Sequence, residues 1–317
     1  MQTYLKSKPV WAQLLLFLGL SFGLFLVLSF IGIAILSSLT GVSIFQLQDI
    51  DKWDTSNPNL ITFIRGTLLV QFLGLFLIPT LLFAYFSDPK PARYLGLKAP
   101  QDPLYWILGI LVMVAAIPMV EYSGWINQQL IPAGSQKWMK ALEEEAAKQI
   151  QFMLKKHTLG ELFKNLIFIS LFAGIGEELF FRGVLQRLFI RATRSPWVGI
   201  VIAAALFSAF HFQFFGFIPR LLLGILLGVI YWYSGSLWPS IIAHFAYDAL
   251  IIVLAYFNPS MLENPDATLM KPGQMLPMAL ISTVLTALLV WHMMRRSKAS
   301  FEAVYRDDLK PQNPFSF

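Results

Sequence analysis

Two carboxylates and an arginine stand within an apolar stretch, in the run from Gly174 to Gly183. At about 3.6 residues per turn, Glu178 and Arg182 fall on one helix face, where an ion pair can satisfy both charges. Glu177 lies about 100° further round the helix, so the same arginine serves it less well. The spacing predicts a structural Glu178–Arg182 pair and a Glu177 carboxylate available as a general base for water. The alternative is a single charge network of all three side chains that holds helices together.

Two histidines follow on later apolar segments. His211 closes the run that begins at Phe207, and His244 stands four residues before Asp248, so these last two share a helix face. A single histidine in an apolar helix is more often a packing residue than a catalyst. This chain has only four histidines, however. Ionisable groups cost about 2.5–3.5 kcal/mol each at the centre of a membrane helix, so their presence beside polar partners indicates function.

The segments that carry these residues have the composition of membrane helices. Of 317 residues, 56% are hydrophobic and 13% are charged, and the mean hydropathy is +0.62. Soluble domains carry about 25% charged residues. The absence of cysteine excludes disulfides, thiol nucleophiles and cysteine metal sites. The net charge of +6 comes from Lys and Arg that flank apolar segments, so we predict the lipid bilayer as a partner and no nucleic acid.

Eight apolar segments are long enough to cross a bilayer, which needs about 20 residues per helix. We predict an all-α fold, a polytopic integral membrane helix bundle with a single membrane domain over residues 1–317. The predicted spans are 11–38, 61–86, 104–126, 163–189, 197–214, 217–233, 238–257 and 274–294. Residues 133–160 interleave apolar and charged side chains, which predicts an amphipathic helix at the membrane interface or, alternatively, an ordinary soluble loop helix.

Basic residues cluster before the first span and after the second, fourth and eighth spans. If the chain alternates across the bilayer, all four clusters fall on one side. The positive-inside rule then predicts a multi-pass protein of the cell membrane with both termini in the cytoplasm. Arg65 is predicted to extend its side chain to the interface, and Arg220 to lie near the interface.

Regular helices would place the candidate site residues at different depths. Glu177 is near the middle of its span, His211 is near the outer end of the next, and His244 lies only a few residues into the seventh. The three side chains converge only if the helices are tilted, staggered or penetrated by water. Gly216 and Pro219 make such irregularity plausible.

Taken in order, the three motifs resemble those of the CPBP family, the CAAX-protease and bacteriocin-processing group of intramembrane peptidases, also called Abi proteins. That family has Glu-Glu-x-x-x-Arg on one helix, Phe-x-x-x-His on the next and His-x-x-x-(Asn/Asp) two helices later. The resemblance covers about residues 161–257, the expected catalytic core, and the eight-span count is similar to that of the prenyl-CAAX endopeptidase branch. The matching residues are Glu177, Glu178, Arg182, Phe207, His211, His244 and Asp248.

The resemblance implies an intramembrane endopeptidase that hydrolyses a peptide bond of a membrane-associated protein or peptide. Glu177 would be the general base, and His211 would help to hold the attacking water. His244 and Asp248 would stabilise the oxyanion of the tetrahedral intermediate. The supporting residues would be Glu178, Arg182 and Phe207. The substrate is not identified by the sequence, since bacteriocin precursors, lipidated tails and membrane-protein ends are all compatible.

Use of a metal stays open in this resemblance. One interpretation makes Glu177, His211, His244 and Asp248 the ligands of a divalent metal such as zinc, and the other has no metal. Asp248 bears on the choice, because the prenyl-protease branch has asparagine there, which donates a hydrogen bond at any pH. An aspartate donates only when it is protonated. Asp248 is therefore expected to be neutral, to orient His244 or to bind a metal.

A different class of function would use the same buried polar residues. A non-catalytic membrane immunity or scaffold protein needs them only for packing, and a proton-coupled carrier needs them as a proton pathway. No internal repeat is visible in the sequence, which disfavours an inverted-repeat carrier.

Overall fold

Helices form all the regular structure in the part of the chain described by this computed structural model, which comprises residues 4–47, 53–54, 57–132, 134, 136–263 and 272–309. Within those ranges, seven helical stretches are long and apolar enough to span a membrane, and α11 (Pro196–Ala209) is a shorter apolar helix. The predicted all-α membrane bundle of about eight spans is confirmed.

The observed spans follow the predicted segments. In chain order they are α1 (Val10–Thr40), α2 (Pro58–Gln71) with η4 (Phe72–Leu77) and α3 (Ile78–Ser87), α5 (Tyr105–Ala115) with α6 (Ile117–Leu130), the stretch Leu159–Thr193, α11, α12 (Phe217–Ser234), α13 (Leu237–Phe257) and α15 (Pro272–Arg296). Among the described residues, four further α-helices connect or follow them: α4 (Pro91–Tyr94), α7 (Gln136–Leu154), α14 (Ser260–Glu263) and α16 (Phe301–Leu309).

Serine caps begin the two helices that carry the histidine motifs. The Ser195 side chain accepts a hydrogen bond from the Val198 amide at the start of α11, and Pro196 occupies its first position. The Ser236 side chain accepts from the Trp238 amide at the start of α13. Gly235, at φ 64°, lets the chain turn tightly from α12 into α13. These local signals fix where each site helix begins.

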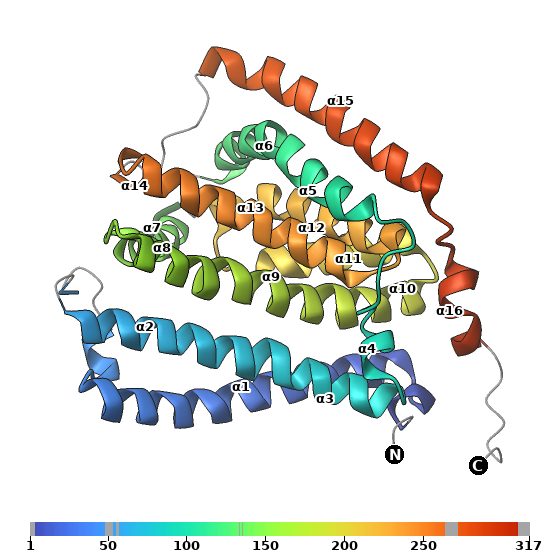
Figure 1. The fold of residues 1–317 in the computed structure, drawn as a ribbon, viewed down its shortest axis with the longest axis horizontal. Coiled ribbons are helices and arrows are strands. Elements are labelled where there is room, and N and C mark those ends of the chain that lie inside the picture. The colour runs from blue at the N-terminus through green and yellow to red at the C-terminus, as the bar shows by residue number, and fades with distance from the viewer. Residues whose placement is uncertain are drawn as a thin grey trace.

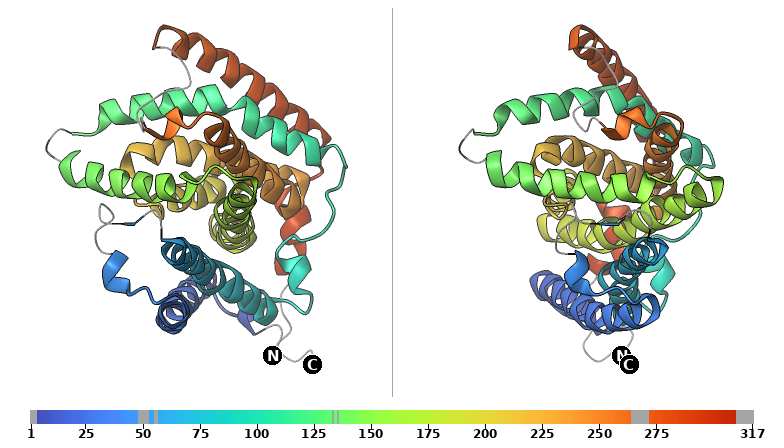
Figure 2. Two further views of the ribbon diagram at one scale, coloured as in Figure 1. Left: turned by 60° about the vertical axis from the view of Figure 1, so that its left-hand side comes forward. Right: turned by 90° about the vertical axis from the view of Figure 1, so that its left-hand side faces the viewer.

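The helices stack in three groups (Figures 1 and 2). α1 packs against α2 and η4 as an N-terminal hairpin on one side of the bundle. The stretch Leu159–Thr193 and helices α11, α12 and α13 form the middle, and α5, α6 and α15 cover the opposite side. η1 (Leu5–Ser7), α4, α10 (Arg187–Thr193) and α16 lie at one end of the bundle. The sequence therefore brings its basic clusters to the same end.

Within the segment 133–160 that was predicted to be an amphipathic helix, the structure has α7 over Gln136–Leu154 and no helix over residues 155–158, while residues 133 and 135 lie outside the described part of the chain. Lys137 and Trp138 are exposed, and the last turn is anchored by Phe152, Met153 and Leu154, which are all buried in the bundle. The chain leaves the helix there, and Thr158 caps the next helix, α8 (Leu159–Asn165). The position of α7 at the membrane interface stays a prediction.

The prediction that Arg65 reaches the interface is wrong. Its side chain is buried, and Nη2 donates to Glu161 Oε2 at 2.6 Å and to Asn165 Oδ1 at 2.7 Å. Glu161 also accepts a hydrogen bond from Lys164 at 2.9 Å. Partners on α8 accept both hydrogen bonds from Nη2 inside the protein, so the side chain points to them and not towards water. A single sequence cannot show that these helices face each other.

Candidate active site

The helix with the two glutamates is continuous from Leu159 to Thr193, but it is not a regular α-helix. Glu177 ends α9 (Phe172–Glu177), and Glu178 begins η7 (Glu178–Gln186), a segment with π-helical hydrogen bonding. A second π-helical segment, η6 (Leu166–Leu171), precedes α9. The expectation of regular 3.6-residue turns is therefore wrong here. π-helical segments widen the turn and change where side chains point, and they are common at functional sites.

Glu178 is completely buried and is surrounded by donors. Its Oε1 accepts hydrogen bonds from Arg182 Nη1 at 2.6 Å and from His244 Nδ1 at 3.0 Å. Its Oε2 accepts from the Ser240 hydroxyl at 2.5 Å. Both oxygens are thus used, which leaves Glu178 poorly suited to proton transfer and well suited to fixing its neighbours. The predicted Glu178–Arg182 ion pair is confirmed.

Arg182 links the glutamate helix, the continuous helical stretch Leu159–Thr193, to α11 and α12. Its Nη2 donates to the backbone carbonyl of Gly224 at 2.9 Å, and its guanidinium lies 4.6 Å from the centre of the Phe207 ring. The Phe207 ring also packs at 5.0 Å from His211 and 5.9 Å from His244. Phe207 is therefore the apolar contact between the arginine and both histidines.

Glu177 differs from Glu178 in having an unused oxygen. Its Oε2 is buried and has no hydrogen-bond partner among the residues that the structure describes. That oxygen lies 4.0 Å from His244 Nε2, which is too long for a hydrogen bond. Glu177 lines a cavity, whereas Glu178 points into the packed interior. The predicted difference between the two carboxylates is therefore visible in their surroundings.

His244 stands between three carboxylates. Because Nδ1 contacts a Glu178 oxygen, Nδ1 carries a proton and donates it. The other ring nitrogen, Nε2, lies 3.4 Å from Asp248 Oδ2 and 4.0 Å from Glu177 Oε2. The helical spacing of His244 and Asp248 thus brings them together as predicted. Glu178 orients this ring from the other side.

His211 lies just beyond the last turn of α11. Its Nδ1 is 2.8 Å from the backbone carbonyl of Phe207, which can only accept, so Nδ1 carries the proton. In the neutral ring, Nε2 then keeps a lone pair. The side chain lines the same cavity as Glu177. A neutral His211 can therefore accept a hydrogen bond from water through Nε2.

The cavity brings all four predicted catalytic residues together, in a volume of about 320 Å³. Regular helices were expected to place Glu177, His211 and His244 at different depths in the membrane. Helices of unequal length and the π-helical segments of the Leu159–Thr193 stretch account for their meeting at one cavity. α11 ends at Ala209, so His211 stands in the turn before the short helix η8 (Phe214–Gly216). The charged and polar lining residues are Glu177, His211, Arg220, His244, Tyr247 and Asp248, and the remaining wall is mainly apolar, with Met113, Val120, Phe207, Leu223, Leu227 and Ile251.

Arg220 is a site residue that the sequence analysis missed. It was predicted only to lie near the interface, yet it lines the cavity near the start of α12. Its Nη1 donates to the Gln213 carbonyl at 3.0 Å, its Nη2 contacts the Gln213 side chain, and Glu143 of α7 lies 3.9 Å away. Burial raises the pKa of Glu143, and the nearby Arg220 charge opposes that rise. The signal in the sequence was an arginine just inside an apolar helix that follows the His211 motif.

Asn127 of α6 holds the connection that carries His211. Its Nδ2 donates to the carbonyls of Phe214 and Phe215, both at 2.7 Å, and its Oδ1 accepts from the Ile218 amide at 3.2 Å. Asn127→Ala removes all three hydrogen bonds from a buried position. We expect the free energy of unfolding to fall by about 1–3 kcal/mol, measured by thermal unfolding in detergent.

The control for this prediction is Asn258→Ala. Asn258 is exposed, and its Nδ2 donates a single hydrogen bond to the Leu254 carbonyl at 3.2 Å. Its loss is expected to change stability by less than about 0.5 kcal/mol. Equal destabilisation by the two substitutions would contradict a clamping role for Asn127.

The cavity was also predicted as a potential metal site. Among the described residues, however, no group of three or more His, Asp or Glu side chains is arranged to hold a metal ion. Nδ1 of His211 and of His244 is engaged in a hydrogen bond, so each ring keeps Nε2 for a ligand in the cavity, as metal-bound histidines typically do. Use of a metal therefore stays a prediction, and the roles proposed below are written without one.

The fold and the cavity define a multi-pass helical membrane protein with a buried carboxylate–histidine site. Residues 160–250 match the family model described as type II CAAX prenyl endopeptidase Rce1-like. All seven motif residues lie inside this range, so the resemblance to the CAAX-protease group is confirmed for this region. That family is one of proteases.

A curated relative matches over a similarly short segment. The chain is 33% identical over 90 residues to the uncharacterized protein YpbD of Bacillus subtilis (strain 168), a match that covers 27% of this chain and 43% of that protein. The match therefore spans less than half the length of this relative. No solved structure gives a significant match to the chain.

Proposed function

We propose that this protein is an intramembrane endopeptidase of the CAAX-protease type that hydrolyses a peptide bond of a membrane-associated protein or peptide. The observation that carries the proposal is the state of Glu177. Glu177 lines the cavity, and its Oε2 is buried, lies 4.0 Å from His244 Nε2 and has no hydrogen-bond partner among the described residues. A general base needs such an unused carboxylate oxygen within reach of its substrate.

The proposed reaction uses water as the nucleophile. Glu177 removes one proton from the water while the lone pair of His211 Nε2 accepts a hydrogen bond from the remaining O–H, and the water oxygen forms a bond to the peptide carbonyl carbon. The electron pair of the C=O bond moves onto oxygen to give the tetrahedral intermediate. When the C–N bond breaks, the proton held by Glu177 passes to the leaving amine. The carboxylate of Glu177 is restored.

His244, oriented by Asp248, is assigned to stabilise the oxyanion of the tetrahedral intermediate. With Nδ1 donating to Glu178, a second proton on His244 Nε2 would point towards the cavity, where it can be donated to the developing negative charge. The 3.4 Å separation of Nε2 from Asp248 Oδ2 favours Asp248 as the residue that orients the ring and helps to hold this proton. In this arrangement Asp248 does not need to contact the oxyanion itself.

The cavity lies towards the end of the bundle opposite the basic clusters. Its wall includes His211, Gly216 and Arg220, which belong to the α11–α12 connection and the first turn of α12. α7 packs against the same connection, with the Trp138 and Phe214 rings 5.1 Å apart. With both termini in the cytoplasm of a cell membrane, substrate would reach the site from the extracytoplasmic half of the bilayer, beside α7.

Cysteine labelling tests this orientation, because the chain has no cysteine to give a background. Lys137 on α7 and Arg295 near the end of α15 are both exposed and lie on opposite sides in the proposed topology. In intact cells, a membrane-impermeant maleimide is expected to label Lys137→Cys and to label Arg295→Cys only after permeabilisation. The reverse pattern would place the cavity on the cytoplasmic side.

The peptidase itself is tested by incubating the detergent-purified protein with a library of membrane-anchored peptides and identifying new termini by mass spectrometry. Cleavage is expected to persist in the presence of a strong chelator, because the proposed steps use only side chains. Loss of cleavage that returns on addition of zinc would assign the candidate ligands to a metal instead.

A further inference from the structure

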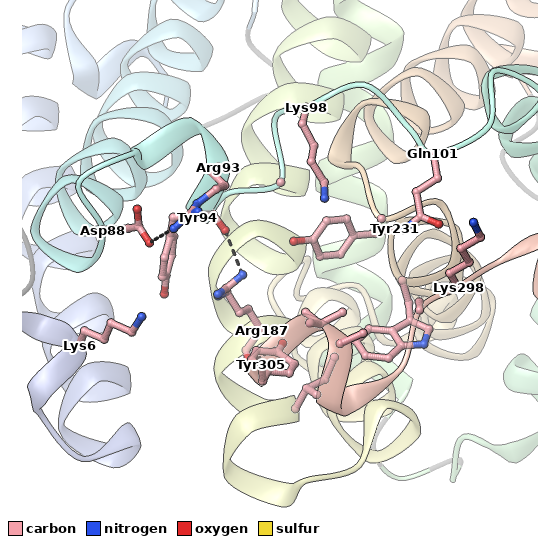
Figure 3. Close-up of a pocket in the computed structure, with 17 residues that line it drawn as sticks. Lys6, Asp88, Arg93, Tyr94, Lys98, Gln101, Arg187, Tyr231, Lys298 and Tyr305 are labelled. Atoms are coloured by element: carbon pink, nitrogen blue, oxygen red, sulfur yellow. Dashed lines mark hydrogen bonds and ion pairs between the residues drawn. The ribbon is translucent and has the colours of Figure 1, made fainter. Parts of the chain in front are cut away.

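A second cavity, of about 280 Å³, lies at the end of the bundle that carries the basic clusters (Figure 3). It is formed where segments far apart in the sequence meet. These are the first residues before α1, the α3–α4–α5 connection, the end of the glutamate helix, and the chain after α15. This cavity shares no lining residue with the candidate active site.

The lining of this cavity is strongly cationic. Five of the described lining residues are basic, namely Lys6, Arg93, Lys98, Arg187 and Lys298, and one, Asp88, is acidic. Asp88 is already engaged, since Oδ1 accepts from the Lys90 amide at 2.8 Å and Oδ2 lies 3.4 Å from Arg93. Among the described lining residues, basic side chains therefore outnumber acidic ones by five to one.

Side-chain contacts hold Arg187 and the backbone at or beside two of the lysines. The Arg187 guanidinium lies 4.6 Å from the centre of the Tyr94 ring and 5.3 Å from that of Tyr305, and its Nη1 donates to the Tyr94 carbonyl at 3.3 Å (Figure 3). The Ser236 hydroxyl donates to the Lys98 carbonyl at 2.5 Å. The backbone beside Lys298 is held by the Ser297 hydroxyl, which donates to the Tyr233 carbonyl at 2.7 Å.

Arginine, lysine and tyrosine supply hydrogen-bond donors, and a concave group of them matches a phosphate group. The cavity also lies where α3, α10, α12 and α15 end, which is the depth of lipid headgroups for helices that span a bilayer. Basic pockets between helices on the cytoplasmic side typically bind anionic headgroups. We infer that this cavity binds a phosphate-bearing anion, presented by an anionic phospholipid or as free phosphate.

The lining comes from separate parts of the chain, because Lys6 precedes α1, Lys98 lies between α4 and α5, and Lys298 follows α15. The cavity therefore exists only in the folded protein. A ligand that binds only the folded state raises stability with its concentration. Thermal unfolding therefore reports binding without any need for peptidase activity.

The test uses the detergent-purified full chain with three probes: dioctanoyl phosphatidylglycerol, dioctanoyl phosphatidylcholine and inorganic phosphate. The variant Lys98→Gln/Lys298→Gln removes two exposed cations of the cavity. The control Arg194→Gln/Arg295→Gln removes two exposed cations at the same end that do not line it. Native mass spectrometry of bound adducts provides a second measurement that does not depend on the unfolding midpoint.

We expect phosphatidylglycerol to raise the unfolding midpoint in a saturable way. The cavity variant is expected to bind it at least about tenfold more weakly, and the control variant within about threefold of the original protein. Equal or greater stabilisation by inorganic phosphate would assign the site to free phosphate, and a preference for the lipid would assign it to a headgroup. Equal weakening in both variants, or binding of phosphatidylcholine as tight as that of phosphatidylglycerol, would overturn the inference. So would the absence of saturable binding by any probe.

Discussion

Glu177→Gln is expected to lower kcat/KM for peptide cleavage by about 10³-fold while the protein stays folded. An amide has nearly the shape of a carboxylate but cannot accept the proton of the attacking water, and positioned general bases contribute about 10²–10⁴-fold. The unused Oε2 has no hydrogen bond within the described structure that the substitution could break. The measurement is cleavage of a substrate identified with the wild-type enzyme, together with the unfolding midpoint of both proteins.

The matched control is Glu302→Gln, the same chemical change at an exposed position in the first turn of α16, at the other end of the bundle. It is expected to leave cleavage within about twofold of the wild type. If Glu177→Gln and Glu302→Gln cleave equally, Glu177 is not the base. That result would favour the alternatives in which the buried polar residues serve a scaffold or a carrier.

Local sequence spacing predicted the parts of the site that lie on one helix. The four-residue separations gave the Glu178–Arg182 ion pair and the proximity of His244 to Asp248, because helical geometry alone brings such residues together. Hydropathy likewise predicted the all-α bundle and its spans. These features depend on interactions within about one helical turn or on the composition of about 20 residues.

Contacts between helices were not predictable in this way. The Glu178–His244 hydrogen bond joins residues 66 positions apart, and it gives Glu178 a second partner that its own helix does not suggest. The pairing of Arg65 with Glu161 spans 96 positions. Arg220 looked peripheral because only the fold turns its side chain towards Gln213 and the cavity. The π-helical segment was missed because helical periodicity assumes a constant turn.

The division of roles between the two glutamates leads to the second large prediction. Arg182→Met is expected to lower the free energy of unfolding by about 3–5 kcal/mol, the cost of leaving one partner of a buried ion pair without the other. Arg182 and Glu178 have side-chain exposures of 1% and 0%, so water cannot replace the lost contact. Thermal and denaturant unfolding in detergent measure the loss, with Arg194→Met as the exposed control.

The double variant Glu178→Gln/Arg182→Met, with the two single variants, completes a double-mutant cycle. The cycle separates the energy of the Glu178–Arg182 interaction from the packing contribution of each side chain. Removing the negative charge together with the positive one should recover part of the stability, because His244 and Ser240 can still hydrogen-bond an amide at position 178. A double variant as unstable as the sum of the single changes would mean that Glu178 and Arg182 act independently. Glu177→Gln is expected to remove activity at nearly constant stability, whereas breaking the Glu178–Arg182 pair is expected to lower the free energy of unfolding. These two results together would assign a chemical role to Glu177 and a structural role to Glu178.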